Sequence, residues 1–145
     1  MATDIWIHIE YHSKKKNKFV YAYEADGERI YPVLGALAGT RSYIEPIYEP
    51  RGLPEDVSRE TLKEFNDFGA DAHTPSWLIT QEFRNCLDLV LQELQKEGNN
   101  LKTVKEWLSP YEKIYDYMKS HEDDGEPCRI VFGLTIRIYM ERLYI

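Results

Sequence analysis

Hydrophobic and polar residues alternate strictly at the start of the chain. Over residues 4–12, isoleucine and tyrosine side chains occupy the odd-numbered positions, while Trp6 and four polar residues occupy the even-numbered ones. A period of two is typical of a β-strand with one buried face and one face in solvent. The alternation returns over residues 18–24 after a lysine-rich connection. We therefore predict an N-terminal β-hairpin whose polar strand face is exposed.

Helical signals fill the middle of the chain. A short apolar run over residues 30–38 predicts a closely packed helix, with Pro32 in its first turn. Ser58 is expected to cap a helix that ends at Phe68, and Thr80 is expected to cap a longer helix with an apolar stripe. Two further helices are predicted, over residues 101–108 and 110–120.

The chain ends as it begins, in a strand pattern. Residues 128–145 are rich in β-branched and aromatic side chains, and they alternate around Gly133, where we expect the strand either to continue or to bend. Strands at both ends predict an α+β fold, in which the hairpin and the C-terminal strands form an antiparallel sheet covered by the central helices. The length fits a single domain over residues 1–145. Because the apolar residues 143–145 are hard to bury in one small sheet, we also expect a homo-oligomer.

The charge balance excludes one broad class of partner. The chain carries 18 Lys and Arg against 25 Asp and Glu, a net charge of −7, which disfavours nonspecific binding to nucleic acid. Cys86 and Cys128 lack the spacing of a zinc or redox motif and indicate reduced thiols. The chain opens without the features of a secretion signal, and no apolar run has the length of a membrane span. We therefore expect a cytoplasmic protein that does not bind membranes.

Two segments look irregular and carry polar and aromatic side chains. Prolines and a glycine punctuate residues 40–57, and residues 70–79 lack a clear period. We expect the two segments to form a ligand-binding pocket between the sheet and the helices. Its expected lining residues are Tyr31, Arg41, Arg51, Asp71, His73, Ser76 and Trp77. Guanidinium groups and flat rings suit a nucleotide-like anion, although the arginines would equally well pin the loop through Glu45, Glu49 or Asp56.

Metal-binding and catalytic signals are weaker. His8, Glu10 and His12 share one strand face at spacings of about 6 to 7 Å. They are weak metal-ligand candidates, because a further element is needed to close the coordination. Asp71 and His73 have the spacing of an oriented acid–base pair, but no nucleophile motif accompanies them. We assign no catalytic residue and expect no cofactor, and a metal-dependent hydrolase that uses either set of residues stays open as an alternative.

Several segments resemble those of a family of small phage and prophage proteins. They are DIWIHIE, IYPVLGALAGTRS, PRGLPEDVS, DAHTPSWLIT and RIVFGLTIRIY, and together they span most of the chain. The resemblance implies a phage accessory protein in the host-cell cytoplasm that counters antiviral defence. Such a protein would be a non-catalytic binder that sequesters a nucleotide-like immune signalling molecule. An alternative is an inhibitor of a host defence protein, with an acidic surface formed by Glu122, Asp123, Asp124 and Glu126.

Overall fold

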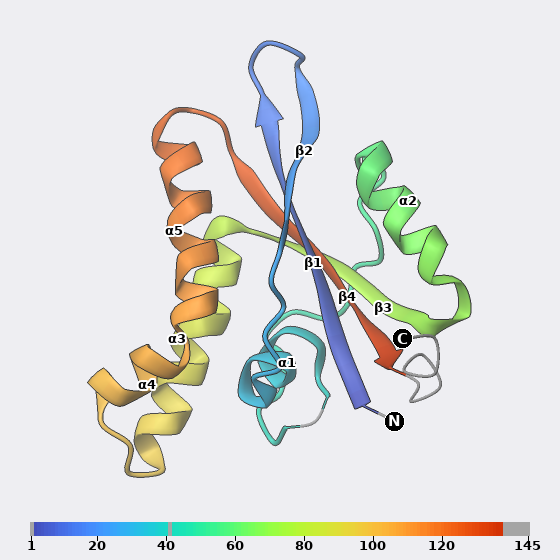
Figure 1. Ribbon diagram of the computed structural model, residues 1–145. Helices are drawn as coiled ribbons and strands as arrows, with labels where there is room; N and C mark the ends of the chain where they lie inside the picture. Colours follow the sequence, from blue (N-terminus) through green and yellow to red (C-terminus); the bar gives the residue numbers. More distant parts are fainter. Residues whose placement is uncertain (1, 41, 138–145) are drawn as a thin grey trace.

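The first and last strands of the described residues lie side by side in the middle of one antiparallel sheet (Figure 1). The computed structural model describes residues 2–40 and 42–137. Within them the sheet has four strands in the order β2-β1-β4-β3. The strands are β1 (Ala2–Ser13), β2 (Lys18–Ala25), β3 (Ala72–Ile79) and β4 (Cys128–Arg137). The prediction of an α+β fold, with the hairpin and the C-terminal strand in one sheet, is confirmed.

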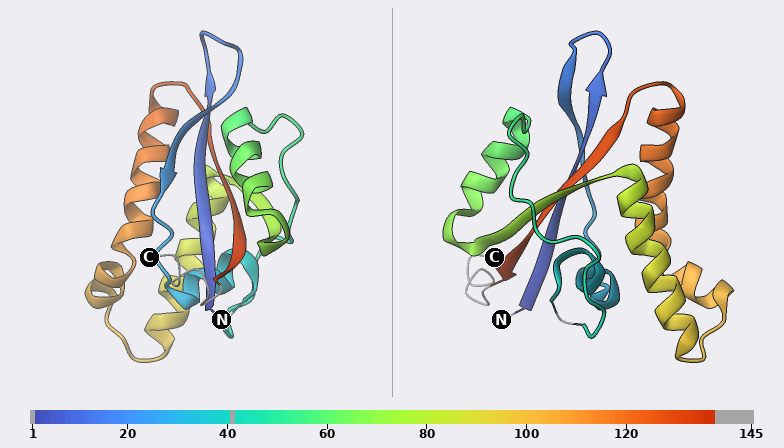
Figure 2. Two further views of the ribbon diagram at one scale, coloured as in Figure 1. Left: turned by 45° about the vertical axis from the view of Figure 1, so that its right-hand side comes forward. Right: turned by 180° about the vertical axis from the view of Figure 1, so that it is seen from behind.

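Helices cover the two faces of this sheet unequally (Figure 2). Helices α3 and α5 pack on one face and enclose the main core, to which α1 and α4 also contribute. Helix α2 lies on the opposite face. The helices are α1 (Tyr31–Ala38), α2 (Arg59–Phe68), the 3-10 turn η1 (Gly69–Asp71), α3 (Thr80–Lys96), α4 (Leu101–Trp107) and α5 (Ser109–Asp123).

Strand β1 alternates as the sequence predicts. Ile5, Ile7 and Ile9 are buried in the main core, on the side of α3 and α5. His8 and Glu10 point to the other face, where their exposed fractions are only 2% and 0%. The prediction of an exposed polar strand face is therefore wrong, because α2 and the loop before it cover this side of the sheet.

The second segment that we expected to be irregular is a strand at the edge of the sheet. β3 pairs with β4, and its register shifts between His73 and Ser76. Within this bulge Thr74 has a φ of 55°, and the next residue, Pro75, has no N–H to give to a ladder. An edge strand tolerates both features because one of its sides needs no partner. The bulge interrupts the alternation, which is why the sequence pattern does not reveal β3.

Polar side chains decide where two of the helices begin. Ser58 caps α2 as predicted, because its hydroxyl accepts a hydrogen bond from the Thr61 backbone N–H at 3.2 Å. The prediction that Thr80 caps α3 is wrong, since Thr80 is already the first helical residue. The carboxylate of Glu82 instead accepts the backbone N–H of Ile79 at 3.1 Å. This contact reaches back from the third helical position to the residue before the helix.

Gly133 makes room for a large side chain. It pairs with Trp6 in the β1–β4 ladder, whose register runs through this position without a shift. A Cβ atom on Gly133 would lie only 2.7 Å from the indole Nε1 of Trp6. Of the two alternatives at Gly133, the continuing strand is the one observed, and the glycine allows the indole to lie close against the sheet.

Residues 138–145 lie outside the described part of the chain. The end of the predicted C-terminal strand falls there, together with the apolar residues on which the expectation of a homo-oligomer rests. Within residues 2–40 and 42–137, no helix is both long enough and apolar enough to cross a bilayer.

Gly133→Ala is expected to lower the free energy of unfolding by about 1 to 3 kcal/mol, because the added methyl group would overlap the Trp6 indole. Urea denaturation followed by far-UV circular dichroism measures this loss. The same substitution should cost less in a Trp6→Leu background, where the ring is absent. An equal loss in both backgrounds would show that the indole is not the cause.

Candidate metal centre

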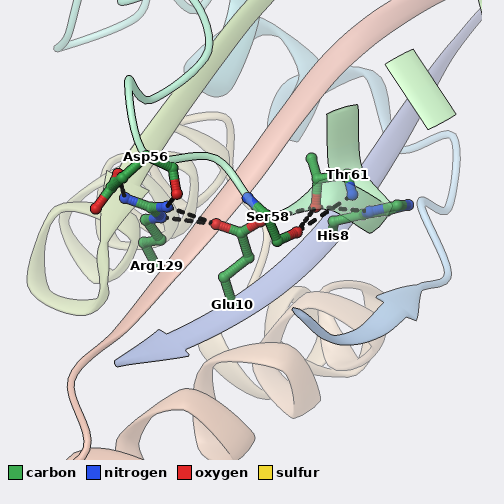
Figure 3. Close-up of polar contacts among 6 residues, drawn as sticks. All are labelled: His8, Glu10, Asp56, Ser58, Thr61 and Arg129. Atoms are coloured by element: carbon green, nitrogen blue, oxygen red, sulfur yellow. Dashed lines mark hydrogen bonds and ion pairs between the residues drawn. The ribbon is translucent and has the colours of Figure 1, made fainter. Parts of the chain in front are cut away.

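A buried carboxylate, Glu10, organises the polar side of the sheet (Figure 3). It pairs with Arg129 across β1 and β4, and Arg129 Nε donates to Glu10 Oε1 at 2.8 Å. Glu10 Oε2 accepts the Ser58 backbone N–H at 3.0 Å and the Thr61 hydroxyl at 2.8 Å. Of the predicted metal ligands, Glu10 is therefore a structural group, and His12 packs edge-on against a phenylalanine ring instead of joining a ligand set.

Arg129 extends this pair to the loop that precedes α2. Its Nη1 donates to Asp56 Oδ1 at 2.7 Å, and its Nη2 donates to the Asp56 carbonyl oxygen at 3.2 Å. Hydrogen bonding from Arg129 lowers the pKa of Asp56. The guanidinium carbon also lies 3.8 Å from the centre of the Phe19 ring. Asp56 thus pins the loop, as one of our two interpretations expected, but its partner is an arginine of β4.

His8 lies beside this network and has one ring nitrogen without a partner. Its Nδ1 is 3.0 Å from the Thr61 hydroxyl oxygen. Its Nε2 is buried, has no hydrogen-bond partner among the described residues, and lies 4.0 Å from Glu64 Oε2. Burial lowers the pKa of His8 and outweighs Glu64, Glu10 and Glu60, which raise it. The imidazole is therefore neutral at pH 7, which is the form that binds metal ions.

Two glutamates face this nitrogen. Glu24 of β2 is the register partner of His8, and Glu64 comes from the second turn of α2. One ligand atom from each of His8, Glu24 and Glu64, the His–Glu–Glu cluster, lies within 4.8 Å of the other two. Burial raises the pKa of Glu24, and so does the neighbouring Glu64 carboxylate. A hydrogen bond between the Glu24 and Glu64 side chains contributes to this shift. Two carboxylates beside an imidazole nitrogen are ligand types that suit a divalent cation.

A β-bulge in the hairpin brings Glu24 opposite His8. The β1–β2 register shifts by one residue just before Glu10, which pairs with Tyr21. Without this shift, Tyr23 would stand opposite His8. The sequence pattern does not identify Glu24 as a site residue, because alternation places it on a strand but does not reveal the bulge that selects its partner.

A shallow hollow of about 470 Å³ opens beside the His–Glu–Glu cluster. Glu24 belongs to both, and Trp6 and Phe68 supply aromatic surface to the hollow. Asp4 and Asp26 add acidic side chains to its lining. The hollow and the cluster share Glu24, whereas His8 and Glu64 do not line the hollow. The Asp4 carboxylate in the lining is paired with Arg29 at 2.6 Å.

Arg51 is engaged in internal contacts in place of the predicted anion pocket. It contacts two other predicted lining residues: its backbone N–H donates to Ser76 Oγ at 3.0 Å, and its guanidinium lies 4.8 Å from the Trp77 ring centre. Its two terminal nitrogens, however, bond the carboxylate of Glu82 at 2.7 and 2.6 Å. The guanidinium fork is thus filled by a carboxylate, and Arg51 pins the loop to the start of α3.

No hydrogen bond, ion pair or ring contact within the described chain joins the other predicted lining residues to Arg51. Tyr31 begins α1 and is partly exposed, and Asp71 ends the turn η1. His73 is exposed on β3, with its ring bonded to the neighbouring threonine hydroxyl. Arg41 lies outside the described residues.

Comparison with protein-family models, with curated proteins and with solved structures finds no match to this chain. Its class is therefore defined by its own fold and site. It is an α+β domain with a candidate metal centre between the central strand β1, the edge strand β2 and helix α2.

Arg129→Met is expected to lower the free energy of unfolding by about 3 to 5 kcal/mol, because it leaves the Glu10 carboxylate buried without its counter-ion. Urea titration at pH 7 measures the change. The double variant Glu10→Gln/Arg129→Met should recover part of the loss, since it also removes the unpaired charge. A loss below about 1 kcal/mol in the single variant would contradict a central role for this pair.

The pair formed by Arg51 and Glu82 is expected to stabilise the fold in a pH-dependent way. Hydrogen bonding from Arg51 lowers the pKa of Glu82. Its contribution is therefore fully present above the ordinary glutamate pKa of about 4.3, and is lost as the pH falls through the lower value in the folded protein. Arg51→Met should reduce the unfolding free energy by about 1 kcal/mol at pH 7 and by less at pH 3, measured by urea denaturation.

Lys63→Met is the control for this experiment. It removes an ion pair with Asp67 that is exposed on both sides, so the unfolding free energy should change little at either pH. If the loss in Arg51→Met were the same at both pH values, the ion pair would not be its source.

Proposed function

We propose that this protein binds a divalent transition-metal ion at the His–Glu–Glu cluster. One observation carries the proposal: the buried Nε2 of His8 has no hydrogen-bond partner among the described residues and lies 4.0 Å from Glu64 Oε2, in a group where one ligand atom from each of His8, Glu24 and Glu64 lies within 4.8 Å of the other two. Buried polar atoms normally have a partner, so an unpaired nitrogen next to two repelling carboxylates favours a bound cation. The ion would join β1, β2 and α2 to one another.

The ligand types favour zinc and related ions. An imidazole with two carboxylates suits Zn²⁺, Mn²⁺ or Fe²⁺, whereas Ca²⁺ takes about six to eight oxygen ligands. Tetrahedral Zn²⁺, with bonds of about 2.0 to 2.1 Å, holds its ligand atoms about 3.3 Å apart. The cluster spans up to 4.8 Å, and the exposed Glu24 and half-buried Glu64 have the freedom to close this gap. Three protein ligands would leave a fourth coordination position open for a further ligand.

The resemblance to phage proteins implies a nucleotide-like ligand, and we propose that the metal ion binds this ligand. Because the Arg51 guanidinium is bonded to Glu82, the open coordination position is the better partner for a phosphate oxygen. We favour sequestration of a nucleotide-like immune signal, without turnover, by a phage protein in the host cytoplasm. The free, buried Cys86 and Cys128 suit such a reducing compartment. Hydrolysis of the same ligand by a metal-activated water is the enzymatic alternative.

Protein stripped of metal with EDTA should bind one equivalent of Zn²⁺ at about pH 7.5 in isothermal titration calorimetry. His8→Gln and Glu64→Gln should each weaken binding by about 100-fold or more, because each removes one of the three ligands. The matched control is His73→Gln, which makes the same change at an exposed imidazole on β3 and should leave the affinity unchanged.

Circular dichroism and thermal unfolding of each variant separate loss of binding from loss of fold. An unchanged zinc affinity in His8→Gln, or an equal loss in His73→Gln, would contradict the proposed site. Parallel titrations with Mn²⁺ and Ca²⁺ test the ion class. Ca²⁺ binding as tight as that of Zn²⁺ would argue against an imidazole ligand.

A further inference from the structure

The hydrogen bonds around Thr61 select one tautomer of His8. We infer that Thr61 is a positioning residue: its hydroxyl oxygen accepts the His8 Nδ1–H, which leaves the Nε2 lone pair free and directed at the His–Glu–Glu cluster. The functional meaning of this arrangement rests on the proposed metal site. The tautomer itself follows from the hydrogen-bond geometry alone.

The Thr61 hydroxyl has three polar neighbours but a single hydrogen to donate. Its oxygen lies 2.8 Å from Glu10 Oε2, 2.9 Å from Ser58 Oγ and 3.0 Å from His8 Nδ1. A carboxylate oxygen only accepts, so the Thr61 hydrogen goes to Glu10. The two lone pairs of the Thr61 oxygen then accept the Ser58 O–H and the His8 Nδ1–H (Figure 3).

Hydrogen-bond donors surround the Glu10 carboxylate, whose two oxygens act as acceptors in all of these contacts. Arg129 Nε donates to Oε1 at 2.8 Å, and Arg129 Nη2 forms an ion pair with the same oxygen at 2.7 Å. The Ser58 backbone N–H donates to Oε2 at 3.0 Å, beside the Thr61 hydroxyl. A proton on Glu10 would displace one of these charge-assisted hydrogen bonds. Arg129 donates to Glu10, so Glu10 also accepts the hydrogen of the Thr61 hydroxyl. The Thr61 oxygen in turn accepts the N–H of His8 Nδ1.

The opposite tautomer leaves two contacts unsatisfied. Thr61 would have to donate to His8 Nδ1, and its oxygen would then face Glu10 Oε2 at 2.8 Å with no hydrogen between them. The His8 Nε2–H would be buried with Glu64 Oε2 at 4.0 Å, which is beyond hydrogen-bonding distance. Each of these defects disfavours the Nε2–H form by on the order of tenfold, so the Nδ1–H form should dominate.

This arrangement prepares His8 as a metal ligand before any metal binds. Imidazole ligands usually donate their second N–H to a carboxylate or carbonyl group, which orients the ring. Here the Thr61 hydroxyl takes that place and passes the contact on to the Glu10 carboxylate. Ser58 and Thr61 belong to the N-terminal cap of α2, so the residues that begin the helix also orient the imidazole.

Long-range ¹H–¹⁵N NMR of the metal-free protein at about pH 7.5 reports the tautomer directly. We expect His8 to show a protonated Nδ1 and an unprotonated Nε2. Thr61→Val keeps the shape but removes the hydroxyl, so it should give mixed tautomers and a Zn²⁺ affinity about 10- to 100-fold lower. Thr61→Ser should restore both readouts. The matched control is Thr80→Val, because the buried Thr80 hydroxyl has no partner among the described residues and should affect neither readout.

The outcomes separate this inference from the proposed metal site. A protonated Nε2 on His8 in the metal-free wild type, or an unchanged Nδ1–H tautomer in a folded Thr61→Val, would overturn the role of Thr61 whatever the zinc titration gives. The expected tautomers in a protein that binds no zinc would support Thr61 and overturn the metal site. If Thr61→Val does not fold, the wild-type and Thr61→Ser spectra still decide, because either is able to contradict the inference.

Discussion

The buried pair of Glu10 and Arg129 is the interaction on which one side of this molecule depends. The two charges lie on the neighbouring central strands, and both are almost completely removed from water. Such a pair is tolerable only where the remaining hydrogen bonds are also made, and Asp56, Ser58 and Thr61 make them. The chain that leads into α2 is thus held by charge and hydrogen bonds, whereas α3 and α5 are held to the other face by apolar packing.

This constraint explains how α2 stays in place with little buried surface. Thr61 is the buried residue of the helix, and Phe65 and Phe68 add ring contacts to Trp6 with centroid distances of 6.1 and 6.3 Å. Helix α2 therefore covers the polar side chains of the sheet with few apolar side chains of its own. It creates the setting in which a buried imidazole, such as that of His8, lies within reach of carboxylates at the surface.

The sequence predicts elements whose signals are local and misses those that depend on distant partners. Alternation identifies β1 and β2, and Ser58 marks the start of α2, because a side-chain cap acts within three residues. Strand β3 escapes prediction because Pro75 and the adjacent bulge hide its period. Glu10 is misplaced on an exposed face because its burial depends on Arg129, 119 residues later in the chain.

The carboxylates of the candidate site also differ in how well the sequence predicts them. The sequence suggests His8 as a metal ligand but groups it with Glu10, whose oxygens are taken by hydrogen-bond donors. Glu24 and Glu64 make no ion pair with Lys or Arg among the described residues, and they lie beside each other and a neutral imidazole. Their position depends on a hairpin bulge and on the face that α2 turns to the sheet, neither of which has a local sequence signal. Burial and the hydrogen bond between Glu24 and Glu64 raise the pKa of Glu24, and either a proton shared by the two carboxylates or a bound cation relieves their repulsion.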